Sequence, residues 1–162
     1  MKMLVVYYSR TGCTKKIAQA LAGKLGADIE EIREVKGRNG AMGYLTAGKD
    51  AAFKKPSDIK PTSKDPTKYD LVLIGTPVWS FTVASPLRMY LSQHNWEGRQ
   101  VGYFVTQTAS GDDRTFNELE DLTGRRPVAV MTILEKDVAA DQFAASIDSF
   151  VKQLNNVFAA TR

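Results

Sequence analysis

Residues 7–14, "YYSRTGCT", place hydroxyl, glycine and thiol groups directly after an apolar run. Two chemistries suit such a segment: a cysteine nucleophile at Cys13, or a loop that binds a phosphate group. A thiol at a helix N-terminus is activated as a nucleophile. Phosphatase-type cysteine loops, however, carry an arginine six positions after the cysteine, where this chain has Gln19, and the lone His94 is far away in sequence. Because Cys13 lacks a partner, the segment favours the phosphate loop.

The phosphate interpretation rests on hydroxyl groups and a glycine ahead of a predicted helix, at Ser9, Thr11, Gly12 and Thr14. Hydroxyls and free backbone N–H groups at a helix N-terminus bind a phosphate without a basic side chain. Lys15 and Lys16 fall in the first helical turn, where the helix dipole disfavours cations and where the sequence has no acid. We expect a bound anion to offset their repulsion. Capping of the helix by Ser and Thr alone is the alternative.

Other nucleotide and metal motifs do not fit this chain. No GxGxxG follows the first apolar run and no GxxxxGK[ST] occurs, so the dinucleotide and P-loop fingerprints are missing. A phospho-accepting receiver domain needs acids at the ends of two strands, where this sequence has Tyr7, Tyr8, Ile74 and Gly75. One cysteine and one histidine also cannot supply the four ligands of a structural zinc site.

Length and composition indicate a single domain over residues 1–162, with 43% hydrophobic and 25% charged residues. No stretch approaches the roughly 20 apolar residues of a membrane span, and the N-terminal apolar run is too short for a signal peptide. We therefore expect a cytoplasmic protein without a membrane span.

The basic charge of the chain is concentrated in residues 36–68, which hold eight Lys or Arg and three Asp. This segment has few aromatic residues and little arginine, so we expect a solvated basic face and no nucleic-acid binding. We interpret it as an insert between two strands, with a short helix over about 42–54. A role in partner docking or as a cover over the site is the alternative.

Apolar runs and helical stripes alternate along the chain. Strands are predicted at 3–8, 28–35, 69–75, 101–106 and 128–134, and helices at 15–25, from Ser85 onward and over about 137–158. This alternation predicts a doubly wound α/β fold, a five-stranded parallel sheet with helices on both faces. Ligands of such sheets bind beyond the carboxyl ends of the strands. The loops "SRTGCT", "TPVWSFTVAS" and "TQTASGDD" are therefore the candidate site.

Two of these loops carry a resemblance to a known family. "SRTGCT" fits the S/T-x-T-G-x-T phosphate loop of flavodoxins, and "GTPVWSFTVASP" is similar to the segment that holds the flavin ring in that family. The resemblance covers the chain outside the basic insert and is to the short-chain type. It implies a flavodoxin-like strand order of 2-1-3-4-5 and bound FMN.

The resemblance also implies a set of FMN-binding residues and no catalytic side chain. The phosphate would be surrounded by Ser9, Arg10, Thr11, Gly12, Cys13 and Thr14. One side of the isoalloxazine would be lined by Thr76, Pro77, Val78, Trp79, Ser80 and Phe81, with Trp79 packed on the ring unless it is only a core aromatic. The pyrimidine edge would face Thr106, Gln107, Thr108, Ala109, Ser110 and Gly111.

Three functions follow as hypotheses. The first is electron transfer through bound FMN between redox partner proteins, and the second is an NAD(P)H-dependent quinone or flavin reductase. The third is a binding module without a cofactor that acts through the insert. Carrier flavodoxins are acidic and often stack a tyrosine from the third loop on the flavin, whereas "TQTASGDD" has no aromatic. The outer face of the flavin would then be open, or covered by Phe81 or by the insert.

Overall fold

The computed structural model describes residues 1–35 and 58–160. Within these ranges the longer strands are β1 (Met3–Tyr8), β2 (Asp28–Ile32), β3 (Leu71–Trp79), β5 (Gln100–Gln107) and β6 (Pro127–Leu134). A short strand, β4 (Thr82–Val83), follows β3. The helices are α1 (Cys13–Leu25), α3 (Ser85–Ser92), α4 (Asp112–Thr123), α5 (Glu135–Ala139) and α6 (Ala144–Ala160), with a 3-10 turn, η1, at Pro66–Lys68.

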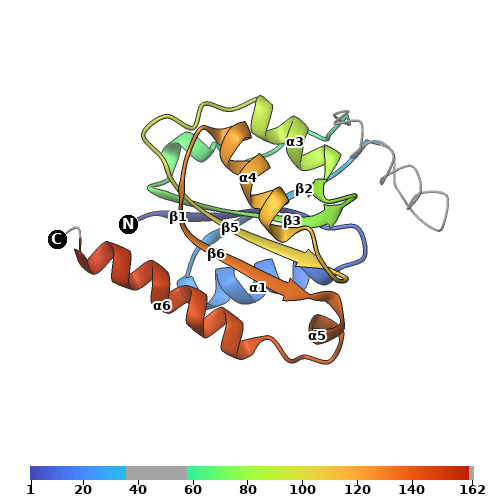
Figure 1. The fold of residues 1–162 in the computed structure, drawn as a ribbon. Coiled ribbons are helices and arrows are strands. Elements are labelled where there is room, and N and C mark those ends of the chain that lie inside the picture. Colours follow the sequence, from blue (N-terminus) through green and yellow to red (C-terminus); the bar gives the residue numbers. More distant parts are fainter. Residues whose placement is uncertain (36–57, 161–162) are drawn as a thin grey trace.

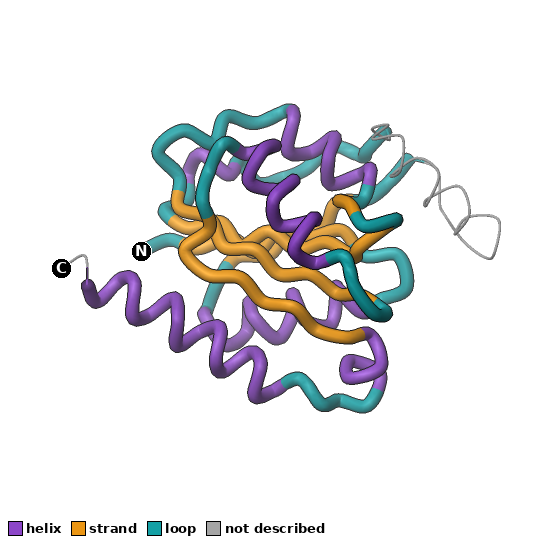
Figure 2. The backbone as a smooth tube through the Cα atoms, in the orientation of Figure 1, coloured by secondary structure: helices purple, strands orange, loops and turns teal. Residues whose placement is uncertain are grey.

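The strands form one sheet in the order β2-β1-β3-β5-β6, and all neighbours along this path are parallel. This confirms the predicted doubly wound fold. The short β4 lies beside β3 in antiparallel orientation; without it, β5 and β6 are the fourth and fifth strands, and the order is the predicted 2-1-3-4-5. Tyr7 lies level with Gly75, and Pro77 with Thr106. The carboxyl ends of β1, β3 and β5 therefore meet at one edge, and the loops that leave them lie together on the right side in Figure 2.

Helices cover both faces of the sheet, with α3 and α4 on one face and α1 and α6 on the other (Figure 1). In β1, Leu4 and Val6 pack under α3 and α4, whereas Val5 and Tyr7 pack under α1 and α6. A central strand whose side chains are buried on both faces must be apolar at every position, which explains the unbroken hydrophobic run.

Several predicted boundaries differ from the structure: the strand predicted over 69–75 is β3, Leu71–Trp79, and helix α4 was not predicted. The last helix, predicted over about 137–158, is divided into α5 and α6, and Asp141 in the connection has a φ of 56°. An aspartate tolerates this left-handed conformation better than most residues, and the helical spacing of apolar residues did not reveal the break. The strand predicted to Val35 ends at Ile32. The predicted insert helix lies outside the described residues.

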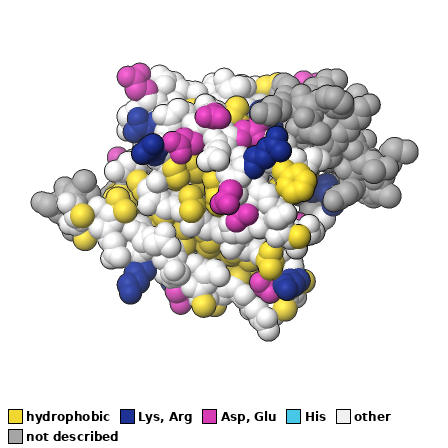
Figure 3. All heavy atoms as spheres, in the orientation of Figure 1, with side chains coloured by type: hydrophobic (Ala, Val, Ile, Leu, Met, Phe, Trp, Pro, Cys, Tyr) yellow, Lys and Arg dark blue, Asp and Glu magenta, His cyan; other side chains and the backbone are white. Residues whose placement is uncertain are grey.

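The described surface carries mixed charge on the face drawn in Figure 3, where basic and acidic side chains are interspersed. Hydrophobic side chains gather between α4 and α6 on this face, beside the edge strand β6. No helix among residues 1–35 and 58–160 is long and apolar enough to cross a membrane.

Candidate functional site

A pocket opens where the carboxyl ends of β1, β3 and β5 meet. The chain leaves β1 toward one face of the sheet and leaves β3 toward the other, and such a reversal of strand order leaves a crevice between the two connections. The pocket is lined by the loops after β1 and β5, the start of α1, the end of β3 and the start of α5: Arg10, Thr11, Thr14, Pro77, Val78, Trp79, Thr108 and Glu135.

The loop after β1 turns sharply into helix α1. Gly12, the N-cap residue, has a φ of 100°, which glycine adopts without steric cost. Its N–H donates to Ser9 Oγ at 3.1 Å, and no side chain caps the helix. Because the N–H groups of the first turn have no side-chain acceptor, they are available to an anion.

The two lysines of the first turn are neutralised by distant acids. Lys15 Nζ lies 3.3 Å from Glu31 of β2, and Lys16 forms an ion pair with Asp141 between α5 and α6. Burial raises the pKa of Glu31, but hydrogen bonds from Arg33 and Lys15 lower it by more, so it lies below its ordinary value. These ion pairs offset the two lysines, so their place in the first turn does not by itself require a bound anion. The support for an anion site is the uncapped helix start.

Thr14 joins the start of α1 to the end of β5. Its hydroxyl lies 2.7 Å from the hydroxyl of Thr106 at the end of β5, and both residues are buried. A hydroxyl has one donor and two acceptor positions, so this bond leaves each threonine capacity for a further partner. The pair holds the start of α1 against the sheet.

The loop after β3 contains a tight hairpin turn. Trp79 pairs with Thr82, and the residues between them, Ser80 and Phe81, have φ values of 49° and 62°. Positive φ at both central positions belongs to the type I′ turn, which favours Asn-Gly because larger side chains are strained there. In addition, Phe81 is 52% exposed. A strained backbone and an exposed aromatic ring thus stand beside the pocket.

Trp79 belongs both to the apolar core and to the pocket wall. Its ring meets the ring of Tyr8 edge-on, with centroids 5.2 Å apart, and it belongs to the core cluster under α3 and α4. It also lines the pocket. The core role and the ligand role considered for this residue are therefore compatible.

The loop after β5 packs against the hairpin turn. Gly111, the N-cap of α4, has a φ of 114°. A Cβ atom at this position would lie 2.8 Å from Val78 Cγ1 and 3.0 Å from Phe81 Cδ1. The side walls formed by the second and third loops are thus in direct contact, and only glycine fits between them.

Gln107 ends β5 and is 5% exposed. Its side chain and the Thr132 hydroxyl both hydrogen-bond the Asp112 carboxylate, the latter at 2.8 Å. Burial raises the pKa of Asp112, and these hydrogen bonds lower it by more, leaving it below its usual value. Among the described residues, Gln107 Oε1 has no partner. The protein alone therefore leaves a buried acceptor unsatisfied next to the third loop.

A family model described as flavodoxin matches residues 2–150. This chain belongs to the flavodoxin family. No match is found among curated protein sequences.

Solved structures with this flavodoxin fold include two bacterial flavoproteins. One, from Lactobacillus acidophilus NCFM in complex with FMN, is 25% identical, with a TM-score of 0.68 over 88% of this chain and 98% of that chain. The other, from Bacteroides eggerthii DSM 20697, is 21% identical, with a TM-score of 0.68 over 93% and 98% of the two chains. An NADH:FMN oxidoreductase in its apo form is 14% identical, with a TM-score of 0.54 over 96% and 90%.

The pocket of this flavodoxin brings together part of the predicted set. Arg10, Thr11 and Thr14 meet Pro77, Val78, Trp79 and Thr108, although they come from three separate segments. The remaining predicted residues do not line this pocket: Ser9, Gly12, Cys13, Thr76, Ser80, Phe81, Thr106, Gln107, Ala109, Ser110 and Gly111. Thr76 is fully buried, and its hydroxyl bonds Pro77 O and the Ala84 N–H.

Sequence reasoning missed Glu135, which lines the pocket from the first residue of α5. It follows β6 directly, so it also lies at the carboxyl end of a parallel strand. Extending the search to the residues after the last strand would have found it.

Cys13 and His94 lie on opposite faces of the sheet. The Cys13 side chain packs against the apolar cluster under α1 and α6. His94, the single histidine of the chain, belongs to the opposite face, where it contacts Tyr90 and Trp96.

Cys13→Ala is expected to leave FMN affinity within about twofold of wild type, because the backbone N–H at this position is retained. Titration of the apoprotein with FMN, followed by flavin fluorescence quenching, measures this. Loss of binding in Cys13→Ala would show that the sulfur itself contacts the ligand, and Cys13→Ser is the matched variant that keeps a polar atom there.

Proposed function

We propose that this protein binds FMN in the described pocket and transfers electrons through it. One observation carries the proposal: the uncapped start of α1 and the hydroxyls of Thr11 and Thr14 share a pocket with the wall Pro77–Trp79. A phosphate site next to an apolar aromatic wall suits a flavin mononucleotide, which has one phosphate and one large planar ring. The FMN complex of the Lactobacillus acidophilus flavoprotein supports this.

The chemistry of the described residues fits FMN. The backbone N–H groups and hydroxyls of residues 9–14 would hold the phosphate, and residues 76–81 would line one side of the ring. Residues 106–111 would face the pyrimidine edge, which has N–H and C=O groups. The unpartnered acceptor Gln107 Oε1 offers such an N–H group a hydrogen bond.

When bound, FMN supplies one-electron and hydride transfer chemistry. The protein's part is to hold the ring in a fixed orientation and to exclude water from one face. Trp79 and Pro77 are buried and would exclude water from that face, and the contact between Gly111 and the hairpin turn would fix the orientation of the ring.

A second candidate function is reduction of a small acceptor by NAD(P)H, and the third loop favours it. Thr108, Ala109 and Ser110 are exposed and small, so no aromatic side chain from this loop covers the site. A nicotinamide ring needs such space beside the flavin. Electron exchange with a redox partner protein remains our first proposal, since it requires no catalytic side chain.

Two measurements separate these functions. We expect the purified protein, or apoprotein mixed with FMN, to show the visible absorption of bound oxidised flavin. Absence of FMN binding would overturn both candidates and leave a binding module without a cofactor. Anaerobic mixing with NADPH or NADH then distinguishes them: fast bleaching indicates a reductase, and bleaching that requires a separate reductase indicates a carrier.

Glu135→Gln is expected to tighten FMN binding by a few-fold. A carboxylate beside the phosphate loop repels a ligand phosphate, and removing one partly exposed charge is worth up to about 1 kcal/mol. The gain should shrink at high salt because the repulsion is screened. Titrations at two ionic strengths measure it, with Glu97→Gln as a control for net charge. Weaker binding would instead mean that Glu135 accepts a hydrogen bond from the ligand.

A further inference from the structure

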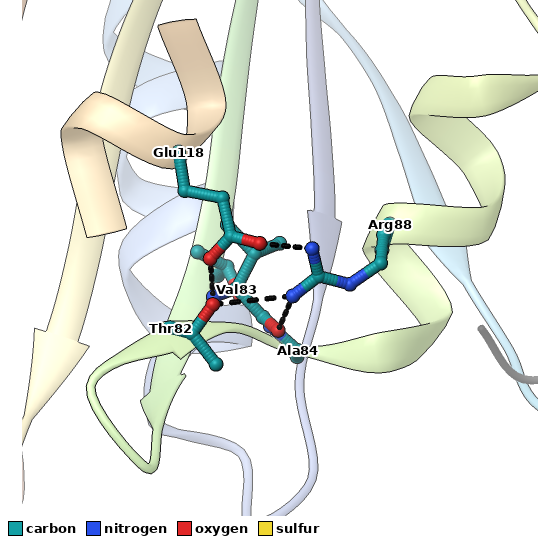
Figure 4. Close-up of polar contacts among 6 residues, drawn as sticks. Thr82, Val83, Ala84, Arg88 and Glu118 are labelled. Carbon is teal, nitrogen blue, oxygen red and sulfur yellow. Dashed lines mark hydrogen bonds and ion pairs between the residues drawn. The ribbon is translucent and has the colours of Figure 1, made fainter. Parts of the chain in front are cut away.

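A buried ion pair stands behind the hairpin turn of the second loop (Figure 4). Arg88 of α3 and Glu118 of α4 form this pair, and they are only 7% and 8% exposed. The second guanidinium nitrogen of Arg88 donates to Thr82 Oγ1 at 3.1 Å and to Val83 O at 3.2 Å. The second carboxylate oxygen of Glu118 accepts from the Val83 N–H at 3.1 Å.

The ion pair hydrogen-bonds the edge of β4 that faces away from β3. Within residues 1–35 and 58–160, β4 pairs with β3 alone, so its other edge would leave backbone groups unpaired inside the protein. Both Val83 groups on that edge, the N–H and the C=O, are bonded by the two charged side chains. Buried backbone groups without partners are costly, so the pair determines where β4 can lie.

The same contacts reach the pocket wall. Thr82 and Val83 follow the Ser80–Phe81 turn directly, and Trp79 and Val78 are their partners in β3. The neighbouring Ala84 N–H donates to the Thr76 hydroxyl at 3.2 Å, and that hydroxyl donates to Pro77 O at 2.8 Å. Arg88 lies on the helix after the second loop and Glu118 on the helix after the third. One ion pair therefore joins the elements that follow both side walls of the pocket.

We propose that Arg88 and Glu118 are positioning residues for the pocket: their ion pair holds β4 and the Ser80–Phe81 turn, and through them the wall Pro77–Trp79, in the place that the flavin ring requires. The inference deepens the proposed function and rests on it. A buried ion pair is a weak source of net stability, because desolvation offsets the attraction of the charges. Its fork of directed hydrogen bonds suits a positioning role better.

The main test removes both charges at once. In Arg88→Met/Glu118→Met the side-chain volumes stay similar and no lone buried charge is left, so the sheet and helices are expected to fold. Val83 loses both side-chain partners. Hydrogen exchange of its amide in the apoprotein is expected to be at least about tenfold faster, and the Kd for FMN at least about tenfold higher. Arg88→Lys keeps the charge without the planar guanidinium group, so we expect intermediate values of the Val83 exchange rate and of the Kd for FMN.

Two controls separate positioning from general loss of stability. Glu120→Gln removes a carboxylate charge two residues further along α4, where Glu120 pairs with the exposed Arg126. It should change neither the Val83 exchange rate nor the Kd for FMN. Leu154→Ala removes a buried side chain from the opposite face of the sheet and lowers the melting temperature without touching the turn. Its Kd for FMN should stay near that of wild type.

The outcomes are distinct. Fast Val83 exchange together with weak FMN binding in the double variant, and normal binding in Leu154→Ala, supports the proposal. Unchanged exchange or unchanged Kd in the double variant overturns it, as does equal weakening in Leu154→Ala at matched stability. If the wild-type protein binds no FMN, the proposed function fails, and Val83 exchange alone decides whether the pair holds the turn. The circular dichroism of the bound flavin provides a further readout, because it reports the surroundings of the ring.

Discussion

Gly111→Ala is expected to lower the free energy of unfolding by about 2–4 kcal/mol and to weaken FMN binding at least about tenfold. Two costs add at this position. The backbone has a φ of 114°, which residues with a side chain rarely adopt, and the new Cβ would lie 2.8 Å from Val78 Cγ1. The hairpin turn must move away from the third loop to make room. Since Val78 lines the pocket, the shift reaches the ligand.

Gly124→Ala is the matched control, at the other end of the same helix. Gly124 also has a positive φ, 64°, but no atom lies within 4 Å of its would-be Cβ. We expect a loss of about 1 kcal/mol from backbone strain alone and unchanged FMN affinity. Urea unfolding of both apoproteins and FMN titration make the comparison. Equal effects of the two substitutions on FMN binding would show that the contact with the turn is irrelevant to the site.

Replacing Thr11 and Thr14 by valine is expected to raise the Kd for FMN by roughly 100-fold, because a hydrogen bond to a charged group is worth about 1.5 kcal/mol or more. Valine has nearly the shape of threonine and keeps the backbone N–H groups. The change therefore removes the hydroxyls and leaves the helix N-terminus in place. Binding of riboflavin, which lacks the phosphate, should change much less, and this contrast locates the effect at the phosphate.

The structure adds a control to this experiment, since Thr14 bonds the buried hydroxyl of Thr106. Thr14→Val alone leaves Thr106 without a partner, which costs about 1–3 kcal/mol of stability. In Thr14→Val/Thr106→Val both hydroxyls are gone, and stability should recover. If FMN affinity recovers with stability in that protein, the threonines act on the fold and not on the ligand. Thermal unfolding of the apoproteins measures stability, and FMN titration measures affinity.

Much of the fold was predictable because local patterns agree with it. The apolar run over β1 and the stripe of Ile17, Leu21 and Leu25 in α1 specify a buried parallel strand and a covering helix. The break between α5 and α6 was not predictable in this way. It depends on a left-handed residue, Asp141, and apolar spacing continues on both sides of it.

The site was predictable at the level of loops and less so at the level of atoms. The three loops do converge, and Thr11, Trp79 and Thr108 line one pocket. The pairing of Lys15 with Glu31 and the contact of Gly111 with Phe81 join residues far apart in sequence. No spacing rule along the chain encodes such contacts, because packing determines them.

The sequence by itself determined the class of fold and the loops that form the pocket, and its resemblance to the flavodoxins implied the order of the strands. Hydrophobic periodicity and turn residues are local properties, and the handedness of crossovers restricts how such elements can assemble. Only the tertiary structure decided which side chains meet. Nothing in the sequence analysis singled out Arg88 or Glu118, yet they form a buried pair behind the pocket wall. The physical reason is burial. Away from water, the two charges and the Val83 N–H and C=O groups need hydrogen-bond partners within the protein, and they bond one another.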